Sequence, residues 1–472
     1  MKEQLKDIYE HIDKNFEKYV EEIRNYLRVA SISYTGEGIE EGAEATARLI
    51  RSIDGETKIV PLRGGYPVVY GKVKSKNPKA KTILFYSHYD VVQVTPEDWT
   101  FPPFAAEVVN AEKVNLPAEM GKVIIARGAH DKKGPNLGLL FALGAIKEAR
   151  GDIPVNVIWI FEGEEEIHSP NLKQFVNQYY EELNEADACY SCGSYRQFPS
   201  GLLVIHPGYR GSVAIDLEVK GGAWGGRTDG KGVWSAYAPF VDQPMLRLVH
   251  AISAMLSPDG KVLVEGFYDN WLPPTPEEKR EIEKSKERFD KTTIRQDLSY
   301  VKRFKGGLSG EELFEDFLTA PQIIPIGISS GYKEDIPMKA TARLHCRFGP
   351  NLSSEEILQK IRRHLYKCGF PEVDVHTPTR RIEWSRSLIS EDIVQALIRM
   401  AEIHGVEYVV WPSSVASNPI YLFNRPPLNK PMVCGSLGHG GRHHVADEYI
   451  TVEGLRNNMR GAVTFLHEYA SG

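Results

Sequence analysis

The sequence predicts an α/β protein in which a mostly parallel sheet flanked by helices is interrupted by a smaller α+β domain. Over the first 207 residues, strand-like apolar runs alternate with helix-like runs, the pattern of a parallel α/β sheet. From residue 208 the pattern changes to half-exposed strands followed by helices. At 472 residues the chain is long enough for two domains. We expect a main domain in two parts, 1–207 and 377–472, and an inserted domain at 208–376.

The expected elements follow the spacing of apolar residues along the chain. In the main domain, helices are expected at 1–28, 136–148, 171–183, 392–403 and 452–469, and strands at 82–86, 123–126, 155–161, 186–190 and 431–434. In the inserted domain, strands are expected at 212–219 and 341–348, and helices at 244–256, 276–289 and 354–366. Ser169 and Pro170 predict the start of the 171–183 helix, as N-cap and first helical residue.

Composition excludes several classes of protein. The chain is 42% hydrophobic and 25% charged, as in ordinary soluble proteins, and its net charge of -6 argues against a nucleic-acid partner. No apolar run approaches the ~20 residues of a membrane span, and the charged N-terminus lacks the apolar core of a signal peptide. Five cysteines do not make a disulfide framework in a chain of this length. We therefore predict a cytoplasmic protein that binds neither nucleic acid nor membrane.

Four short segments carry histidine and carboxylate side chains, and together they predict a metal site. They are 87–90 (SHYD), 127–134 (RGAHDKKG), 161–166 (FEGEEE) and 442–449 (RHHVADEY). His88, Asp131 and Glu165 each follow an apolar strand run, and functional residues of parallel sheets lie at the carboxyl ends of strands. We therefore expect these three to meet at one edge of the sheet. Zinc accepts imidazole and carboxylate ligands, and a spare glutamate can activate water.

Each segment alone also has a plain structural interpretation. His88 and Asp90 resemble a solvated pair at a strand end, Asp131 a turn aspartate, and the three adjacent glutamates a solvated charged surface. Their combination in this order favours the metal site. Cys189 and Cys192 form a C-x-x-C pair, which is a weak signal without a redox context.

With these segments the chain resembles the zinc metallopeptidase family of carnosinase, aminoacylase, succinyl-diaminopimelate desuccinylase and glutamate carboxypeptidase. The matching segments are 87–92 (SHYDVV), Trp99 with 102–104 (PPF), 127–135 (RGAHDKKGP), 161–166 (FEGEEE) and 444–449 (HVADEY). The inserted domain looks most like that of the carnosinase-type dipeptidase branch. The resemblance implies a zinc-peptidase catalytic domain, an inserted lid or dimerisation domain, and a homodimer.

The resemblance also implies the metal ligands. His88 would bind one ion, Asp131 would bridge two ions, and Glu166 and His444 would bind the other. The implied cofactor is one or two Zn²⁺ ions, with Mn²⁺ or Co²⁺ as alternatives.

Further roles follow for residues that do not bind metal. Glu165 would be the general base, and Asp90 would orient the His88 ring. Arg347 would grip a substrate carboxylate, a task for which a guanidinium is well shaped.

The chain departs from the family pattern beside the metal site. Gly193 stands where the family has a carboxylate ligand for the His88 metal. Three alternatives remain: Cys192 donates a thiolate, the His88 metal is held weakly, or only one metal binds. Lys132 follows the bridging aspartate where aspartate or asparagine is usual, and His168 replaces a glycine.

Two further departures concern substrate binding. Lys231, in 228–232 (TDGKG), is the nearest match to the histidine that stabilises the transition state in the family, often across a dimer. Ser417 and Asn418 lie where the family has a glycine-rich substrate loop.

The function predicted from these features is hydrolysis of an amide or peptide bond in a dipeptide-like or N-acyl amino-acid substrate. A metal-activated water would attack the bond, with Glu165 as general base. The alternatives are a hydrolase of a non-peptide C–N bond and a catalytically degenerate relative that binds a small molecule or a protein.

Overall fold

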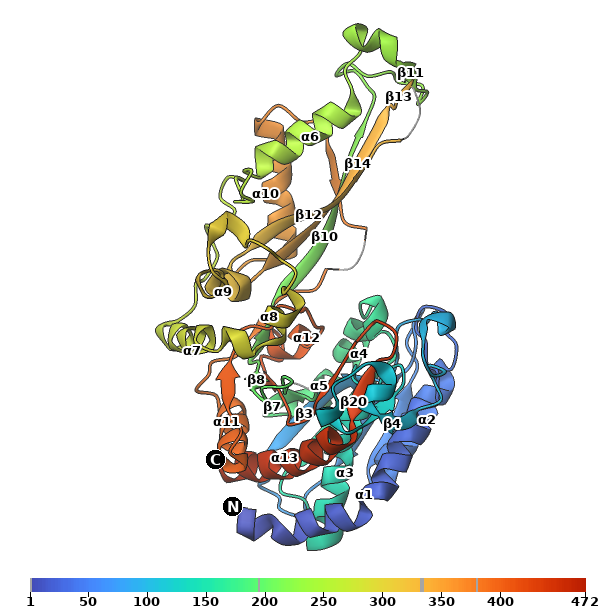
Figure 1. Ribbon diagram of the computed structural model, residues 1–472, viewed down its shortest axis with the longest axis vertical. Helices are drawn as coiled ribbons and strands as arrows, with labels where there is room; N and C mark the ends of the chain where they lie inside the picture. Colours follow the sequence, from blue (N-terminus) through green and yellow to red (C-terminus); the bar gives the residue numbers. More distant parts are fainter. Residues whose placement is uncertain (1, 194–195, 332–334, 379–380) are drawn as a thin grey trace.

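The structure is a computed structural model that describes residues 2–193, 196–331, 335–378 and 381–472. Figure 1 shows two lobes, with both termini in the lower lobe and strands β10, β12 and β14 in the upper lobe. Each lobe has its own apolar core. The predicted architecture, an α/β domain with a separate smaller α+β domain, is confirmed. The predicted boundaries at 208 and 376 fall next to strands β10 and β15 of the upper sheet.

A six-stranded sheet with the order β1-β2-β6-β3-β7-β18 forms the centre of the lower lobe. Its strands are β1 (Glu56–Val60), β2 (Val68–Val73), β3 (Thr82–His88), β6 (Asn156–Glu162), β7 (Ala188–Ser191) and β18 (Met432–Cys434). Strands β6, β3, β7 and β18 run parallel, while β1 and β2 are antiparallel additions at one edge. The middle residues of the parallel strands β3 and β6 are apolar because helices cover both faces of the sheet.

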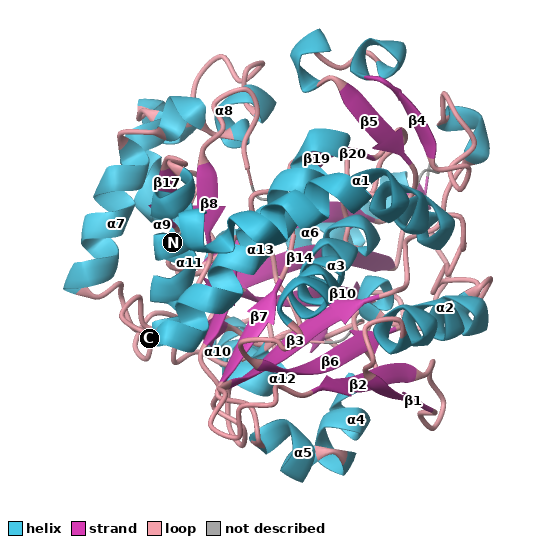
Figure 2. Cartoon of the chain, turned by 90° about the horizontal axis from the view of Figure 1, so that it is seen from below, coloured by secondary structure: helices cyan, strands magenta, loops and turns pink. Residues whose placement is uncertain are grey.

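The helices of the lower lobe lie on both sides of the central sheet (Figure 2). One core contains α1 (Lys6–Leu27), α2 (Ile39–Arg51), α3 (Lys133–Arg150), α11 (Asp392–His404) and α13 (Val452–Ser471). The other contains α4 (Leu172–Gln178) and α12 (Tyr421–Asn424), with α5 (Tyr180–Asn184) beside them. Helix α1 shows why these helices form: its apolar residues recur every three or four positions, and all of them face the core. None of the helices in the described ranges combines the length and the apolar composition of a membrane span.

The predicted helix at 171–183 is wrong in its start and its continuity. The structure has two short helices there, and Asn171 rather than Ser169 precedes the first of them. Ser169 has a left-handed φ of 49°, and its hydroxyl donates to Glu162 Oε1 at 2.9 Å. A hydroxyl directed at Glu162 does not cap the helix, which the sequence motif could not reveal.

The predicted strand at 123–126 exists but belongs to a different sheet. Strand β5 (Lys122–Ile125) lies in an antiparallel sheet with β4 (Glu107–Asn110), β19 (Gly440–Gly441) and β20 (Tyr449–Thr451). The expectation that Asp131 follows a strand of the central sheet is therefore wrong. A four-residue apolar run does not distinguish a core strand from a strand of a small side sheet.

The upper lobe contains an antiparallel sheet with the order β12-β14-β10-β15. These strands are β10 (Gly211–Lys220), β12 (Gln322–Ser329), β14 (Lys339–Phe348) and β15 (Asp374–His376), and helices α6 (Pro244–Met255) and α10 (Ser354–Lys367) share their core. The small hairpin of β11 (Val233–Trp234) and β13 (Asp335–Ile336) lies at the far tip of the lobe (Figure 1).

A third group of elements joins the two lobes. Helices α7 (Pro276–Lys286) and α9 (Gly310–Thr319) share a small core with β8 (Leu203–Ile205) and β17 (Tyr408–Val410). The remaining α-helix and strands of the described residues are α8 (Thr293–Asp297) and the strand pair β9 (Gly208–Tyr209) and β16 (Ser385–Arg386).

Candidate metal and catalytic site

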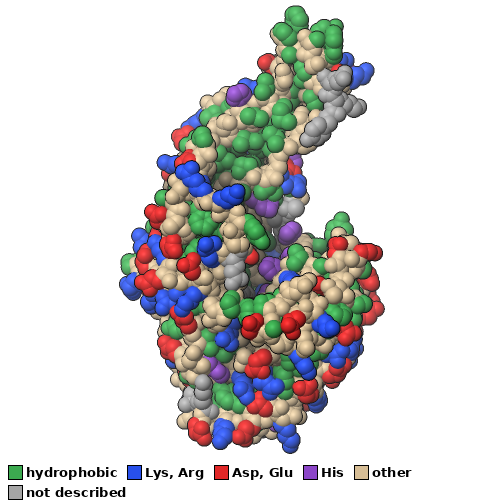
Figure 3. Space-filling model, in the orientation of Figure 1, with side chains coloured by type: hydrophobic (Ala, Val, Ile, Leu, Met, Phe, Trp, Pro, Cys, Tyr) green, Lys and Arg blue, Asp and Glu red, His purple; other side chains and the backbone are tan. Residues whose placement is uncertain are grey.

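The site begins where two parallel strands of the central sheet end. Strand β3 ends at His88, which pairs in register with Glu162 at the end of β6. The turn after β6 carries Glu165 and Glu166, so the sheet brings the histidine and the acidic turn together. Figure 3 shows histidine side chains gathered in the hollow between the two lobes. The carboxyl ends of parallel strands thus supply one half of the site.

The four predicted metal ligands lie close together. The ligand atoms of Asp131, Glu166 and His444 all lie within 4.8 Å of one another, and those of His88, Glu165 and Glu166 form a second such group. His444 Nε2 is 3.0 Å from Glu166 Oε2 and 3.2 Å from Asp131 Oδ2. His88 Nε2 is 3.8 Å from Asp131 Oδ1. One imidazole and two carboxylates make a donor set that fits a catalytic zinc ion.

Asp90 contacts both the His88 ring and the turn that carries Glu165 and Glu166. It is fully buried, and its Oδ1 lies 3.2 Å from His88 Nδ1. Its carboxylate also accepts the backbone N–H groups of Glu165 at 3.2 Å and Glu166 at 3.0 Å. Burial would lower the pKa of His88, but its contacts with Asp131 and Asp90 outweigh burial and raise that pKa. Asp90 therefore fixes the ring and the acidic turn together, the arrangement expected of a residue that supports a metal ligand.

Glu165 lies beside the ligands and contacts the predicted substrate loop. Burial is the main cause that raises the pKa of its carboxyl group in the metal-free protein. Asn418 Nδ2 donates to Glu165 Oε1 at 3.4 Å. A carboxyl group with a raised pKa is suited to accept and return a proton near neutral pH.

The predicted substrate residues Arg347, Ser417 and Asn418 form one continuous row with Glu165. Arg347 comes from β14 of the upper lobe, and its Nη1 donates to Ser417 Oγ at 3.4 Å. Ser417 and Asn418 come from the lower lobe, and Asn418 is 4% exposed. The row therefore spans the junction between the lobes and ends at the candidate base.

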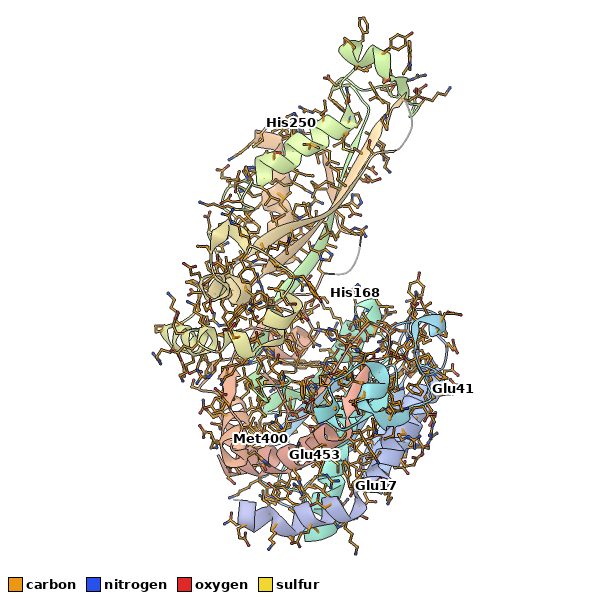
Figure 4. All side chains as sticks on the ribbon, in the orientation of Figure 1. Glu17, Glu41, His168, His250, Met400 and Glu453 are labelled. Carbon is orange, nitrogen blue, oxygen red and sulfur yellow. The ribbon has the colours of Figure 1, made fainter. Side chains whose placement is uncertain are left out.

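The structure places Lys231 far from this row. Lys231 is exposed in the turn before β11, where its backbone N–H donates to Asp229 Oδ1 at 3.2 Å. That turn lies at the tip of the upper lobe, the end remote from the lower lobe (Figure 1). Within one chain, Lys231 therefore does not reach the metal ligands. His168, in contrast, lies on the side of the lower lobe that faces the upper lobe (Figure 4) and has a left-handed φ of 68°.

The structure also directs Cys192 away from the ligand clusters. Its side chain is fully buried in the main core, with Sγ 3.5 Å from Pro135 O and 3.5 Å from Asn458 Oδ1. Burial raises the pKa of the thiol to about 11, which disfavours the thiolate that zinc requires. Among the described residues, neither ligand group contains Cys192. The prediction of a thiolate ligand thus finds no support in this geometry.

Sequence reasoning missed Glu448, which holds the loop that carries Asp131. Glu448 is fully buried and accepts four hydrogen bonds. The donors, at 2.7 to 2.9 Å, are Arg127 Nη1 and the backbone N–H groups of Gly128, His130 and Asp131. The 127–134 and 442–449 segments were both visible in the sequence, but no local pattern pairs residues more than 300 positions apart.

Zinc binding should release protons and strengthen as pH rises. Hydrogen bonds with Asp131 and Glu166 raise the pKa of His444 to about 10, and burial raises that of Glu166 to about 8. In the metal-free protein at pH 7 the cluster therefore holds at least one proton that a metal must displace. At lower pH protons occupy these groups more fully and compete more strongly with zinc for them. Titration calorimetry in two buffers of different ionisation enthalpy should show at least one proton released per zinc; zinc affinity independent of pH would contradict this expectation.

Comparison with known proteins identifies the relatives of this chain. The model of Peptidase family M20/M25/M40 matches residues 84–468. The Cys-Gly metallodipeptidase dug1 of Schizosaccharomyces pombe is 28% identical over 395 residues, which cover 78% of this chain and 76% of that protein. The Beta-Ala-His dipeptidase of Rattus norvegicus is 26% identical over 321 residues, which cover 63% of this chain and 58% of that protein.

Solved structures show the same fold. The M20 family metallo-carboxypeptidase Sso-CP2 of Sulfolobus solfataricus superposes with a TM-score of 0.82 at 28% identity, covering 96% of this chain and 99% of that chain. Human carnosine dipeptidase 1 superposes with a TM-score of 0.75 at 20% identity, covering 99% and 100%. Fold and site thus define a metal-dependent peptidase of two lobes. The chain belongs to Peptidase family M20/M25/M40.

Proposed function

We propose that this protein is a zinc-dependent hydrolase that cleaves the amide or peptide bond of a dipeptide-like or N-acyl amino-acid substrate. The observation that carries the proposal is the position of Glu165. Its carboxylate lies within 4.8 Å of ligand atoms of His88 and Glu166. It also accepts a hydrogen bond from Asn418 of the predicted substrate loop. The relatives named Cys-Gly metallodipeptidase and Beta-Ala-His dipeptidase support a short peptide as substrate.

Metal binding, proton transfer and positioning fall to different residues of the site. Asp131, Glu166, His444 and His88 are the side chains that would hold metal, and a divalent ion supplies Lewis acidity and lowers the pKa of water. Glu165 takes a proton from the attacking water and returns it to the leaving amine nitrogen. Asp90 keeps the acidic turn and the His88 ring in place during these transfers. Loss of turnover with retained zinc in Glu165→Gln tests the proposal.

Arg347 should bind the free carboxylate of the substrate. Arg347→Met is expected to raise KM about 10- to 100-fold for a dipeptide, because a charge-assisted hydrogen bond is lost. For the corresponding dipeptide amide, which lacks the carboxylate, KM should change little. Steady-state kinetics with both substrates measure this difference.

The same strand offers a matched control for Arg347. Arg343 also lies on β14 but is half exposed and pairs with Asp216 at 2.7 Å. Arg343→Met should leave KM for the dipeptide unchanged. Equal losses for the dipeptide and its amide in Arg347→Met would contradict a carboxylate-binding role.

We also propose a homodimer in the cytoplasm. Strand β12 is an edge strand of the upper sheet, and its Ile326 and Ile328 side chains are about half exposed, as expected of a surface that pairs with a second copy. All five cysteines are free thiols, which suits a reducing compartment. A monomeric mass in light scattering would contradict the dimer.

A further inference from the structure

We propose that this chain binds a single divalent metal ion through Asp131, Glu166 and His444, and that the Lys132 ammonium takes the place of a second ion beside His88. The inference rests on the proposed function, because that function places metal in the same cluster. It goes further by fixing the number of ions and the side of the cluster that holds the metal.

Among the described residues, strand β7 and Gly193 after it supply no metal ligand beside His88. Strands β3 and β7 run parallel, with Ile83, Leu84 and Phe85 opposite Ala188, Cys189 and Tyr190. Continuing this register places Gly193 level with His88. Parallel neighbours at the same level direct their side chains to the same face of the sheet. On the β7 side, the position best placed to supply a ligand next to His88 is therefore a glycine, which has no side chain.

The two described residues that precede Gly193 do not replace the missing ligand. Cys192 points to the opposite face, into the main core, where its thiol contacts Pro135 and Asn458. Ser191 lies on the same face as Gly193, since strand side chains alternate. The Ser191 hydroxyl oxygen already accepts a hydrogen bond from a charged group, since Lys132 Nζ donates to Ser191 Oγ at 3.3 Å.

The Lys132 ammonium thus lies on the flank where a second metal would need a ligand. Its charge acts on the carboxylates of both Asp131 and Glu165. An ammonium supplies one positive charge to these acidic groups without needing a ligand set, whereas a divalent ion at the same place would be repelled by it. On the other side, Asp131, Glu166 and His444 offer three donor atoms within 4.8 Å of one another.

Zinc stoichiometry tests the number of ions without reference to activity. The full-length protein is loaded with zinc, desalted and measured by inductively coupled plasma mass spectrometry. We expect one zinc per chain. Two zinc ions would overturn the inference and leave the proposed function intact, while no zinc would overturn both.

Two single variants test which side holds the ion. His444→Ala should reduce the stoichiometry from one zinc to none, whereas His88→Ala should retain one zinc. The reverse pattern would overturn the assignment. Circular dichroism and thermal unfolding of each variant establish that it is folded before its metal content is compared.

A double variant tests the role of Lys132 and Gly193. Lys132→Asp combined with Gly193→Asp removes the ammonium and adds carboxylates beside His88, so the zinc content should rise from one to two. Lys79→Asp changes charge at an exposed loop lysine and should leave it at one. A folded double variant that still binds one zinc would overturn the role assigned to these two positions.

Discussion

Glu165→Gln is expected to lower kcat by about 10²- to 10⁴-fold while the bound zinc is unchanged. Glutamine keeps the size of the side chain and its contact with Asn418, but its amide cannot accept a proton from water. The metal remains because Asp131, Glu166 and His444 are untouched. Steady-state kinetics on a dipeptide, together with the zinc content of the same sample, measure both quantities.

A second acidic position provides the control for this experiment. Glu181 is exposed on α5, and Glu181→Gln removes the same charge away from the site, so kcat should stay at the wild-type value. An unchanged rate in Glu165→Gln would remove Glu165 from the mechanism. A slow enzyme that has also lost its zinc would instead make Glu165 a metal ligand.

Glu448→Ala is expected to destabilise the protein by about 3–5 kcal/mol and to weaken zinc binding. The substitution leaves the buried Arg127 guanidinium and three backbone N–H groups without their acceptor. One of these N–H groups belongs to Asp131, so the loop that presents a metal ligand loses its anchor. Urea unfolding of the metal-free protein measures the stability, and zinc titration measures the affinity.

The metal-free form separates the two effects of this variant, because bound zinc would itself stabilise the folded state. Glu453→Ala is the matched control on the same stretch of chain. Glu453 is exposed and pairs with Arg456 within its own helix, a contact worth about 0.3–0.5 kcal/mol. If Glu448→Ala were no more destabilised than this control, Glu448 would not be the anchor of the loop.

Much of the fold was predictable because the longer elements have a clear apolar period. Helix α1 and strand β14 each show their spacing over ten residues or more, and the structure places both within a few residues of the prediction. The failures lie in short segments. Strand β5 is only four residues long, and its sheet is decided by long-range pairing with β4 and β20. The start of α4 depends on where one hydroxyl, that of Ser169, donates its hydrogen bond.

The residues of the candidate site were likewise predictable only in part. His88, Asp131, Glu166 and His444 were identifiable because their chemical types and order match a known family, and the structure brings them together. Glu448 was not identifiable as an anchor, since its partners lie more than 300 positions away. Lys231 was matched by a short glycine-containing motif, and such motifs fit any exposed turn.

The two separate cores have a consequence for unfolding. Arg347 belongs to the lobe with the upper core, while Glu165 and Asn418 belong to the lobe with the lower core. Two cores of this kind can melt as separate cooperative units, so heating the free protein need not give a single transition. A ligand that binds Arg347 and the metal cluster at the same time contacts both lobes across their junction. It links the melting of one unit to that of the other, so calorimetric cooperativity becomes a readout of binding that requires no turnover.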